Sequence, residues 1–93
     1  MNAQNLKELQ TNRFNEQIKE ALYSNDFTLS MTFSEGIITQ AKINTCISLK
    51  GHSLDALSYL KKSWNFKELE LKRSGAGIKI EYTGAEKPYP YYA

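Results

Sequence analysis

An unbroken alternation of apolar and hydroxyl residues limits the structures that this chain can form. Residues 27–33 read Phe-Thr-Leu-Ser-Met-Thr-Phe. Successive side chains of a strand point to opposite faces, so this run predicts a strand with one apolar and one polar face. Ser34-Glu35-Gly36 then forms a short turn, and a second extended run begins at Ile37. Together they predict a β-hairpin whose apolar face must be covered.

The second extended run, residues 37–50, is too long for one straight strand. At about 3.3 Å per residue it would span about 45 Å, whereas a domain of this length is about 30 Å across. We therefore expect the run to bend, bulge or divide near Asn44. Its first half would pair with residues 27–33, and its second half would pair with a later hairpin.

Two segments have the spacing of amphipathic helices. Residues 6–22 and 54–64 carry apolar side chains three and four residues apart, which places those side chains on one helical face. In the second segment the apolar stripe consists of Leu54, Leu57, Leu60 and Trp64. We expect Ser53 to be the N-cap of that helix and Asn65 to be its left-handed C-terminal cap.

A second hairpin is predicted around the turn 74–77, because apolar and charged residues alternate on both sides of it. The chain therefore reads helix, hairpin, helix, hairpin. We expect an α+β fold, a two-layer sandwich with two helices on one face of a four-stranded, mainly antiparallel sheet. The strand order stays open, and one parallel pair would be allowed. The domain would span residues 1–84 and be followed by a Pro/Tyr-rich C-terminal tail, residues 85–93.

The alternation also predicts which strand residues face the helices. That inner face consists of Phe27, Leu29, Met31, Phe33, Ile43, Ile47, Leu49, Leu69, Leu71, Ile78, Ile80 and Tyr82. The opposite face would carry mainly hydroxyl, amide and charged side chains, with ordinary ion pairs between neighbouring strands.

Composition excludes several classes of protein. The chain has 93 residues and a formal net charge of +2, which favours neither a strongly basic nucleic-acid arm nor an acidic mimic of DNA. One cysteine, Cys46, and one histidine, His52, make neither an intrachain disulfide nor a structural zinc site. No apolar stretch resembles a secretory signal or a membrane span. We therefore expect a cytoplasmic protein without a metal or cofactor.

Catalytic residues do not converge in the sequence. A nucleophilic pair of Cys46 and His52 can be imagined, but Cys46 occupies a strand position between β-branched residues and His52 a surface turn, so we favour structural roles. Glu68 and Glu70 share a strand face with Lys72, which indicates a solvated charged edge. The glycines at 75 and 77 lack the lysine and hydroxyl of a phosphate-binding loop. We expect no enzymatic activity.

Basic residues concentrate in the second half of the chain. Residues 36–73 hold seven basic and three acidic residues. Lys61, Lys62, Lys67 and Arg73 are candidates for a patch that contacts an RNA or DNA backbone, and the alternative is a solvated helix end. Bases stacked on an open sheet, as in RNA-recognition modules, are not favoured, because the strand aromatics fall on the buried face.

The tail offers a second candidate binding element. Tyr89, Tyr91 and Tyr92 lie beside two prolines. Tyrosine is enriched at interface hot spots, so the tail would anchor a partner. Alternatively, it folds back as a lid over an edge or the open face of its own sheet.

In its small size, its lack of catalytic groups and its two-layer plan, the chain resembles the small inhibitors encoded by phages and mobile elements, of which anti-CRISPR proteins are the best-known group. The resemblance is one of architecture over the whole chain and is not carried by a residue motif. It implies a non-enzymatic binding module that docks on a host protein or protein–nucleic-acid complex in the host cell cytoplasm and blocks it sterically. The near-neutral charge favours a basic-to-neutral or RNA-bearing target. A small nucleic-acid-binding accessory protein and a self-associating structural subunit are the alternatives.

Overall fold

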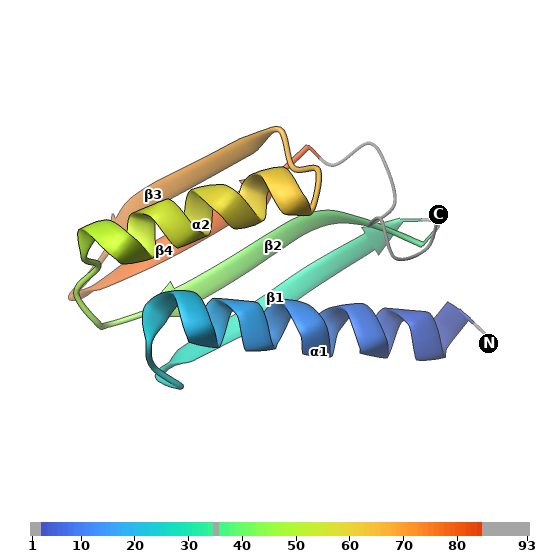
Figure 1. The fold of residues 1–93 in the computed structure, drawn as a ribbon, viewed down its shortest axis with the longest axis horizontal. Coiled ribbons are helices and arrows are strands. Elements are labelled where there is room, and N and C mark those ends of the chain that lie inside the picture. Colours follow the sequence, from blue (N-terminus) through green and yellow to red (C-terminus); the bar gives the residue numbers. More distant parts are fainter. Residues whose placement is uncertain (1–2, 35, 85–93) are drawn as a thin grey trace.

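Two helices cover one face of a four-stranded sheet (Figure 1). The computed structural model describes residues 3–34 and 36–84. Its elements are α1 (Ala3–Leu22), β1 (Phe27–Ser34), β2 (Ile37–Thr45), α2 (Gly51–Ser63), β3 (Glu68–Ser74) and β4 (Gly77–Thr83). The strand order is β1-β2-β4-β3, and each of the three neighbouring pairs is antiparallel. The α+β class and the order helix, hairpin, helix, hairpin are confirmed.

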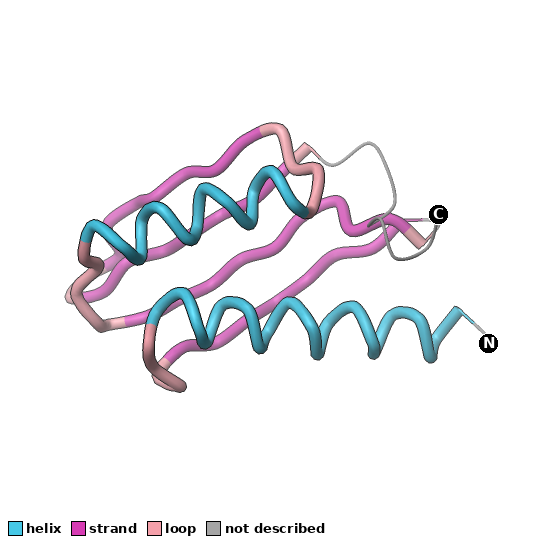
Figure 2. The backbone as a smooth tube through the Cα atoms, viewed as in Figure 1, coloured by secondary structure: helices cyan, strands magenta, loops and turns pink. Residues whose placement is uncertain are grey.

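The two helices run in opposite directions across the sheet (Figures 1 and 2). α1 packs beside β1, whereas α2 packs beside β3. α1 therefore ends at the end of the sheet at which α2 begins. The connection between β2 and α2 carries the chain from one hairpin to the other, so that β4 pairs with the inner strand β2 and β3 becomes an edge.

An aromatic cluster centred on Phe14 joins the two layers. The Phe14 ring meets the rings of Trp64 and Tyr82 edge to face, with centroid distances of 5.0 and 5.6 Å. Phe66, which the sequence analysis missed, lies 6.2 Å from Phe14 and 5.2 Å from Tyr82. The Tyr82 hydroxyl donates a 2.8 Å hydrogen bond to the Leu57 carbonyl oxygen. α1, α2 and β4 are thus fastened to one another at the centre of the core.

The long run divides next to Asn44, as expected, because β2 ends at Thr45, and β2 has a further irregularity at Thr39. Thr32 faces Gln40, whereas Phe33 faces Ile38, so Thr39 is the extra residue of a β-bulge. One extra residue reverses the alternation of the side chains. As a result Ile38 and Ala41 are both buried although they are three residues apart.

The second half of the long run is not a strand, which corrects the expectation that it would pair with the later hairpin. β2 ends at Thr45, and its residues 40–45 pair with 78–83 while the same strand also pairs with β1. The Thr45 hydroxyl donates to the Asp26 carbonyl oxygen at 2.8 Å and accepts the Ile47 N–H at 3.3 Å. The side chain therefore takes backbone partners that would otherwise continue a ladder, and the strand stops there.

α2 begins earlier than its sequence signals indicate. Its first residue is Gly51, with Lys50 at the N-cap position, so Ser53 lies inside the helix and is buried. The buried stripe is Ser53, Leu57, Leu60 and Trp64. A helix turns about 100° per residue, which carries Leu54 to the flank of the helix, where it is 40% exposed. The expected left-handed cap at Asn65 is confirmed by its φ of 62°.

Leu71 was expected on the inner face but is 43% exposed. It lies on β3, which has a neighbouring strand on one side only. Its side chain therefore reaches the rim of the helical layer instead of its centre. By contrast, β1 keeps a strict alternation of half-buried and exposed residues along its whole length, as its sequence predicts.

Candidate functional site

The solvent-facing side of α2 carries a row of chemically diverse side chains. His52, Asp55, Tyr59 and Lys62 are all exposed, and their spacing of three and four residues places them on one face. We call this set the α2 stripe. Tyr59 is 70% exposed, so its ring and hydroxyl are open to a partner while the helix beneath is held by the core.

The α2 stripe continues onto the end of α1. The rings of Tyr23 and His52 meet edge to face with a centroid distance of 4.7 Å. Tyr23 has a φ of 55°, the left-handed conformation in which the helix ends, and its side chain is 77% exposed. Two exposed tyrosines thus lie on the helical layer, one at the end of α1 and one on α2.

Three of the predicted basic residues lie at one corner of the fold. Lys61 and Lys62 lie in the last turn of α2. The chain reverses directly after the helix, where the Phe66 N–H donates to the Lys61 carbonyl oxygen at 2.9 Å and the Asn65 N–H to that of Lys62 at 3.2 Å. Lys67 follows directly and is exposed. We call Lys61, Lys62 and Lys67 the basic corner. It adjoins the α2 stripe through Lys62, which belongs to both sets.

Arg73 does not belong to this corner. It lies at the opposite end of β3 from Lys67, and six residues of strand span about 20 Å. Charges separated by that distance are largely screened at physiological salt, where the Debye length is about 8 Å. The predicted four-residue patch is therefore divided. Tyr89, Tyr91 and Tyr92 lie outside the described residues.

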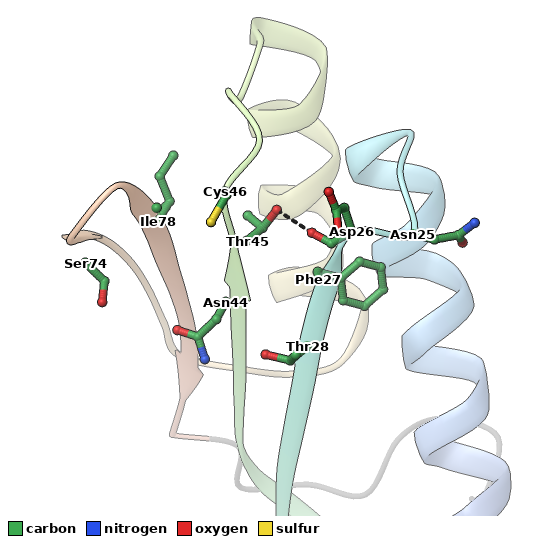
Figure 3. Close-up of a pocket in the computed structure, with 10 residues that line it drawn as sticks. Asn25, Asp26, Phe27, Thr28, Asn44, Thr45, Cys46, Ser74 and Ile78 are labelled. Atoms are coloured by element: carbon green, nitrogen blue, oxygen red, sulfur yellow. Dashed lines mark hydrogen bonds between the residues drawn. The ribbon is translucent and has the colours of Figure 1, made fainter.

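A shallow pocket of about 450 Å³ opens where β1 begins and β2 ends (Figure 3). Most of its lining residues carry polar side chains, and the full lining is Asn25, Asp26, Phe27, Thr28, Asn44, Thr45, Cys46, Ser74, Gly77 and Ile78. The 2.8 Å hydrogen bond from the Thr45 hydroxyl to the Asp26 carbonyl oxygen crosses it. Gly77 comes so close that a Cβ there would lie 2.6 Å from the Thr45 carbonyl oxygen and 3.3 Å from the Cys46 sulfur. The lining offers hydrogen-bonding groups.

Cys46 and His52 have different surroundings. Cys46 is exposed and faces the β3–β4 turn at Gly77, whereas the His52 ring packs against Tyr23. Within residues 3–34 and 36–84, no group of three histidine, cysteine, aspartate or glutamate side chains is arranged to hold a metal ion.

On the open face of the sheet, β3 and β4 place like charges directly opposite each other at two positions. Glu70 lies directly opposite Glu81, and Lys72 directly opposite Lys79. The ion pairs run along the strands instead of between β3 and β4, with Lys72–Glu70 at 3.1 Å and Lys79–Glu81 at 3.4 Å, which corrects the cross-strand pairing expected for these residues. The hydrogen bond to Glu70 and the charges of Glu70 and Glu81 raise the pKa of Lys72.

No family model, curated protein or solved structure matches this chain. Neither helix in the described part of the chain is long and apolar enough to cross a membrane.

Sequence reasoning missed both exposed tyrosines of the helical layer. A signal for Tyr59 was present, because Tyr59 lies two residues after Leu57, and two residues turn a helix by about 200°. A residue so placed faces away from the buried stripe. Tyr23 carried no such signal, since its exposure follows from the left-handed turn that ends α1.

Proposed function

We propose that this protein is a non-enzymatic binding module that docks through the α2 stripe on a host protein–nucleic-acid complex and blocks it sterically. It would act in the cytoplasm of the host cell, as inhibitors encoded by phages and mobile elements do, and needs no cofactor. The observation that carries the proposal is Tyr59, 70% exposed on a helix whose opposite side is fixed in the core. An exposed tyrosine on a rigid element loses little entropy on binding and supplies both ring area and a hydroxyl.

The surroundings of Tyr59 support this role. Lys62 lies one turn after it and Asp55 one turn before it, so an aromatic ring is flanked by charges of both signs. Interface hot spots combine such an anchor with a polar rim. Tyr23, packed edge to face on His52, provides a second aromatic group at the far end of the stripe.

The basic corner indicates the chemistry of the target. Lys61, Lys62 and Lys67 continue the α2 stripe with positive charge, which favours a target that places phosphates or carboxylates there. A complex containing RNA offers both a protein surface for Tyr59 and a backbone for the lysines. The Tyr89, Tyr91 and Tyr92 tail remains a proposed additional anchor.

Capture from a bacterial lysate, with and without nuclease, tests this function. The immobilised wild-type chain is expected to retain a protein partner after nuclease treatment. Lys62→Glu should reduce that retention, whereas Lys19→Glu, an exposed lysine on α1 outside the α2 stripe, should not. Equal retention by both variants, or loss of all partners on nuclease treatment, would contradict docking through the stripe.

The basic corner also favours a second candidate, a small nucleic-acid-binding accessory protein. In that case the chain itself would bind RNA or DNA without a protein partner. Each phosphate neutralised lowers log K by about 0.7–0.9 per unit of log salt, so purified chain and oligonucleotide would give a steep salt dependence. A flat response removes this candidate.

A further inference from the structure

The free edge of β3 has features that no part of the proposed function uses. β3 is the outermost strand of the sheet and pairs with β4 alone among the described strands. Two apolar side chains on the helix side of the sheet are exposed: Leu71 of β3 is 43% exposed and Leu54 of α2 is 40% exposed. His52 contacts Tyr23 at the end of α1, and Leu54 lies about 200° around the helix from His52, so Leu54 faces the flank away from α1, over β3.

The backbone of this edge can accept another strand. The hairpin closes with Ser74 opposite Gly77 and with Gly75 at a φ of 62°, which is typical of a two-residue turn. Hydrogen-bonded and non-hydrogen-bonded pairs then alternate along the ladder. Leu69, Leu71 and Arg73 accordingly turn their backbone N–H and C=O groups away from β4, toward the open edge.

The side chains on the open face lack opposite charges across β3 and β4. Glu70 faces Glu81 and Lys72 faces Lys79, and like charges directly opposite one another are unfavourable. A strand added outside β3 would correct this if it placed a lysine beside Glu70 and a carboxylate beside Lys72. The sequence of β3 is itself such a strand when it runs antiparallel.

We propose that β3 pairs antiparallel with β3 of a second copy of this chain, around a twofold axis at Leu71. In this register Glu70 lies beside Lys72 of the second copy, and Lys72 beside its Glu70. Leu71 meets Leu71, and Leu69 meets Arg73. The two sheets become one of eight strands, and the exposed Leu71 side chains cover each other. Such an interface uses the same surface on both copies and closes on itself.

Charge selects this register over its neighbours. The second strand can shift only to registers that keep its apolar side chains on the helix side of the sheet. Centring the pair on residue 70 sets Glu70 against Glu70, and centring it on residue 72 sets Lys72 against Lys72. Centring on residue 70 also sets Lys72 beside Glu68 of the second copy, but of these three registers only the one at Leu71 sets opposite charges beside each other without two like charges at the axis. The pairing leaves the α2 stripe exposed, so it stands independently of the proposed function.

Charge exchange tests the pairing, with molar mass measured by sedimentation over a range of micromolar concentrations. Wild type is expected to dimerise, and Lys72→Glu should weaken dimerisation by about tenfold or more, because two attractive pairs become repulsive. Lys72→Glu places a carboxylate opposite Lys79, so the monomer should still fold, which circular dichroism checks. The double variant Glu70→Lys, Lys72→Glu should dimerise again. Thr32→Glu, on the other edge strand, should have no effect.

A cysteine at the axis tests the register directly. In a Cys46→Ser background, Leu71→Cys should form a disulfide-linked dimer, because directly paired Cα atoms lie about 5.5 Å apart. Arg73→Cys should not, since its two copies would be about 13 Å apart. A monomeric wild type, dimerisation unaffected by Lys72→Glu, or dimerisation only after residues 85–93 are deleted would each overturn the proposal. The last result would mean that the tail occupies this edge.

Discussion

The indole N–H of Trp64 donates a 2.6 Å hydrogen bond to the side-chain carbonyl oxygen of Gln17. The two residues are 47 positions apart in the chain and belong to the two halves of the fold, Gln17 to α1 and Trp64 to the end of α2. The bond joins α1 to the end of α2 beside the contact between Phe14 and Trp64. The contact between Tyr23 and His52 joins the end of α1 to the beginning of α2.

Gln17→Ala should lower the free energy of unfolding by about 1 kcal/mol, the usual net value of a hydrogen bond of this kind. Urea denaturation measures the change. Glu16→Ala, at an exposed neighbouring position on the same helix, should stay within about 0.5 kcal/mol of wild type. Equal effects of the two substitutions would show that the Gln17 bond does not stabilise the packing of the two helices.

The buried Tyr82 makes the free energy of unfolding depend on pH in the alkaline range. Burial raises its pKa above the usual value of 10.0, so the folded state keeps the proton that the unfolded state loses. Stability is therefore complete below pH 10 and falls above it, by about 1.4 kcal/mol per pH unit for this one group. Tyr82→Phe loses the hydrogen bond to Leu57 and should be less stable at neutral pH. Its stability should fall less steeply above pH 10, and parallel pH curves would contradict this.

Gly77 and Gly51 should respond oppositely to alanine. A Cβ at Gly77 would lie 2.6 Å from the Thr45 carbonyl oxygen, whereas a Cβ at Gly51 meets nothing within 4 Å. Gly77→Ala should destabilise by more than 1 kcal/mol, as overpacking does (about 1–3 kcal/mol). Gly51→Ala should raise stability by about 0.4–1 kcal/mol, because it restricts the unfolded chain without strain in the helix. Thermal unfolding of the pair measures both.

The basic corner should determine how strongly the affinity for an RNA-bearing target depends on salt. Removing one phosphate contact lowers the slope of log K against log salt by about 0.7–0.9. Lys62→Ala is expected to lower it by that amount, whereas Arg73→Ala, at the other end of β3, should leave it unchanged. If Arg73→Ala lowers the slope equally, the four basic residues act together despite their separation.

Deleting residues 88–93 separates the two hypotheses for the tail. As an anchor, the tail should leave the melting temperature nearly unchanged when removed, and partner binding should weaken by more than about 1–2 kcal/mol. A lower melting temperature together with exposure of apolar surface would show that it is a lid over its own sheet.

Alternation and spacing were sufficient to predict the class of fold. The strict pattern of 27–33 appears unchanged in β1, and the glycine-rich turns fall where expected. The end of β2 next to Asn44 was predictable from the length of the run, but the bulge at Thr39 was not, because its position depends on how β2 pairs with β1. The start of α2 was misplaced for a related reason. Ser53 is a good N-cap by type, yet the buried stripe recruits it into the helix.

The candidate site was less accessible from the sequence. Lys61, Lys62 and Lys67 could be grouped because they are close in the chain. Arg73 could not be separated from them, because its distance follows from the direction of β3 after the turn. The contact between Tyr23 and His52 joins the end of α1 to the start of α2. These two helix ends are neighbours because of the strand order, which the sequence left open.

Docking through the α2 stripe is tested by quantifying partner capture for wild type, Tyr59→Ala and Leu9→Ala in nuclease-treated lysate. Leu9 is an exposed apolar residue on α1 and serves as the matched truncation. Truncating a hot-spot tyrosine costs about 2 kcal/mol or more, which is about a thirtyfold loss of affinity. We predict that Tyr59→Ala loses the partner while Leu9→Ala retains it, with both variants folded. Retention of the partner by Tyr59→Ala at the wild-type level would contradict the account.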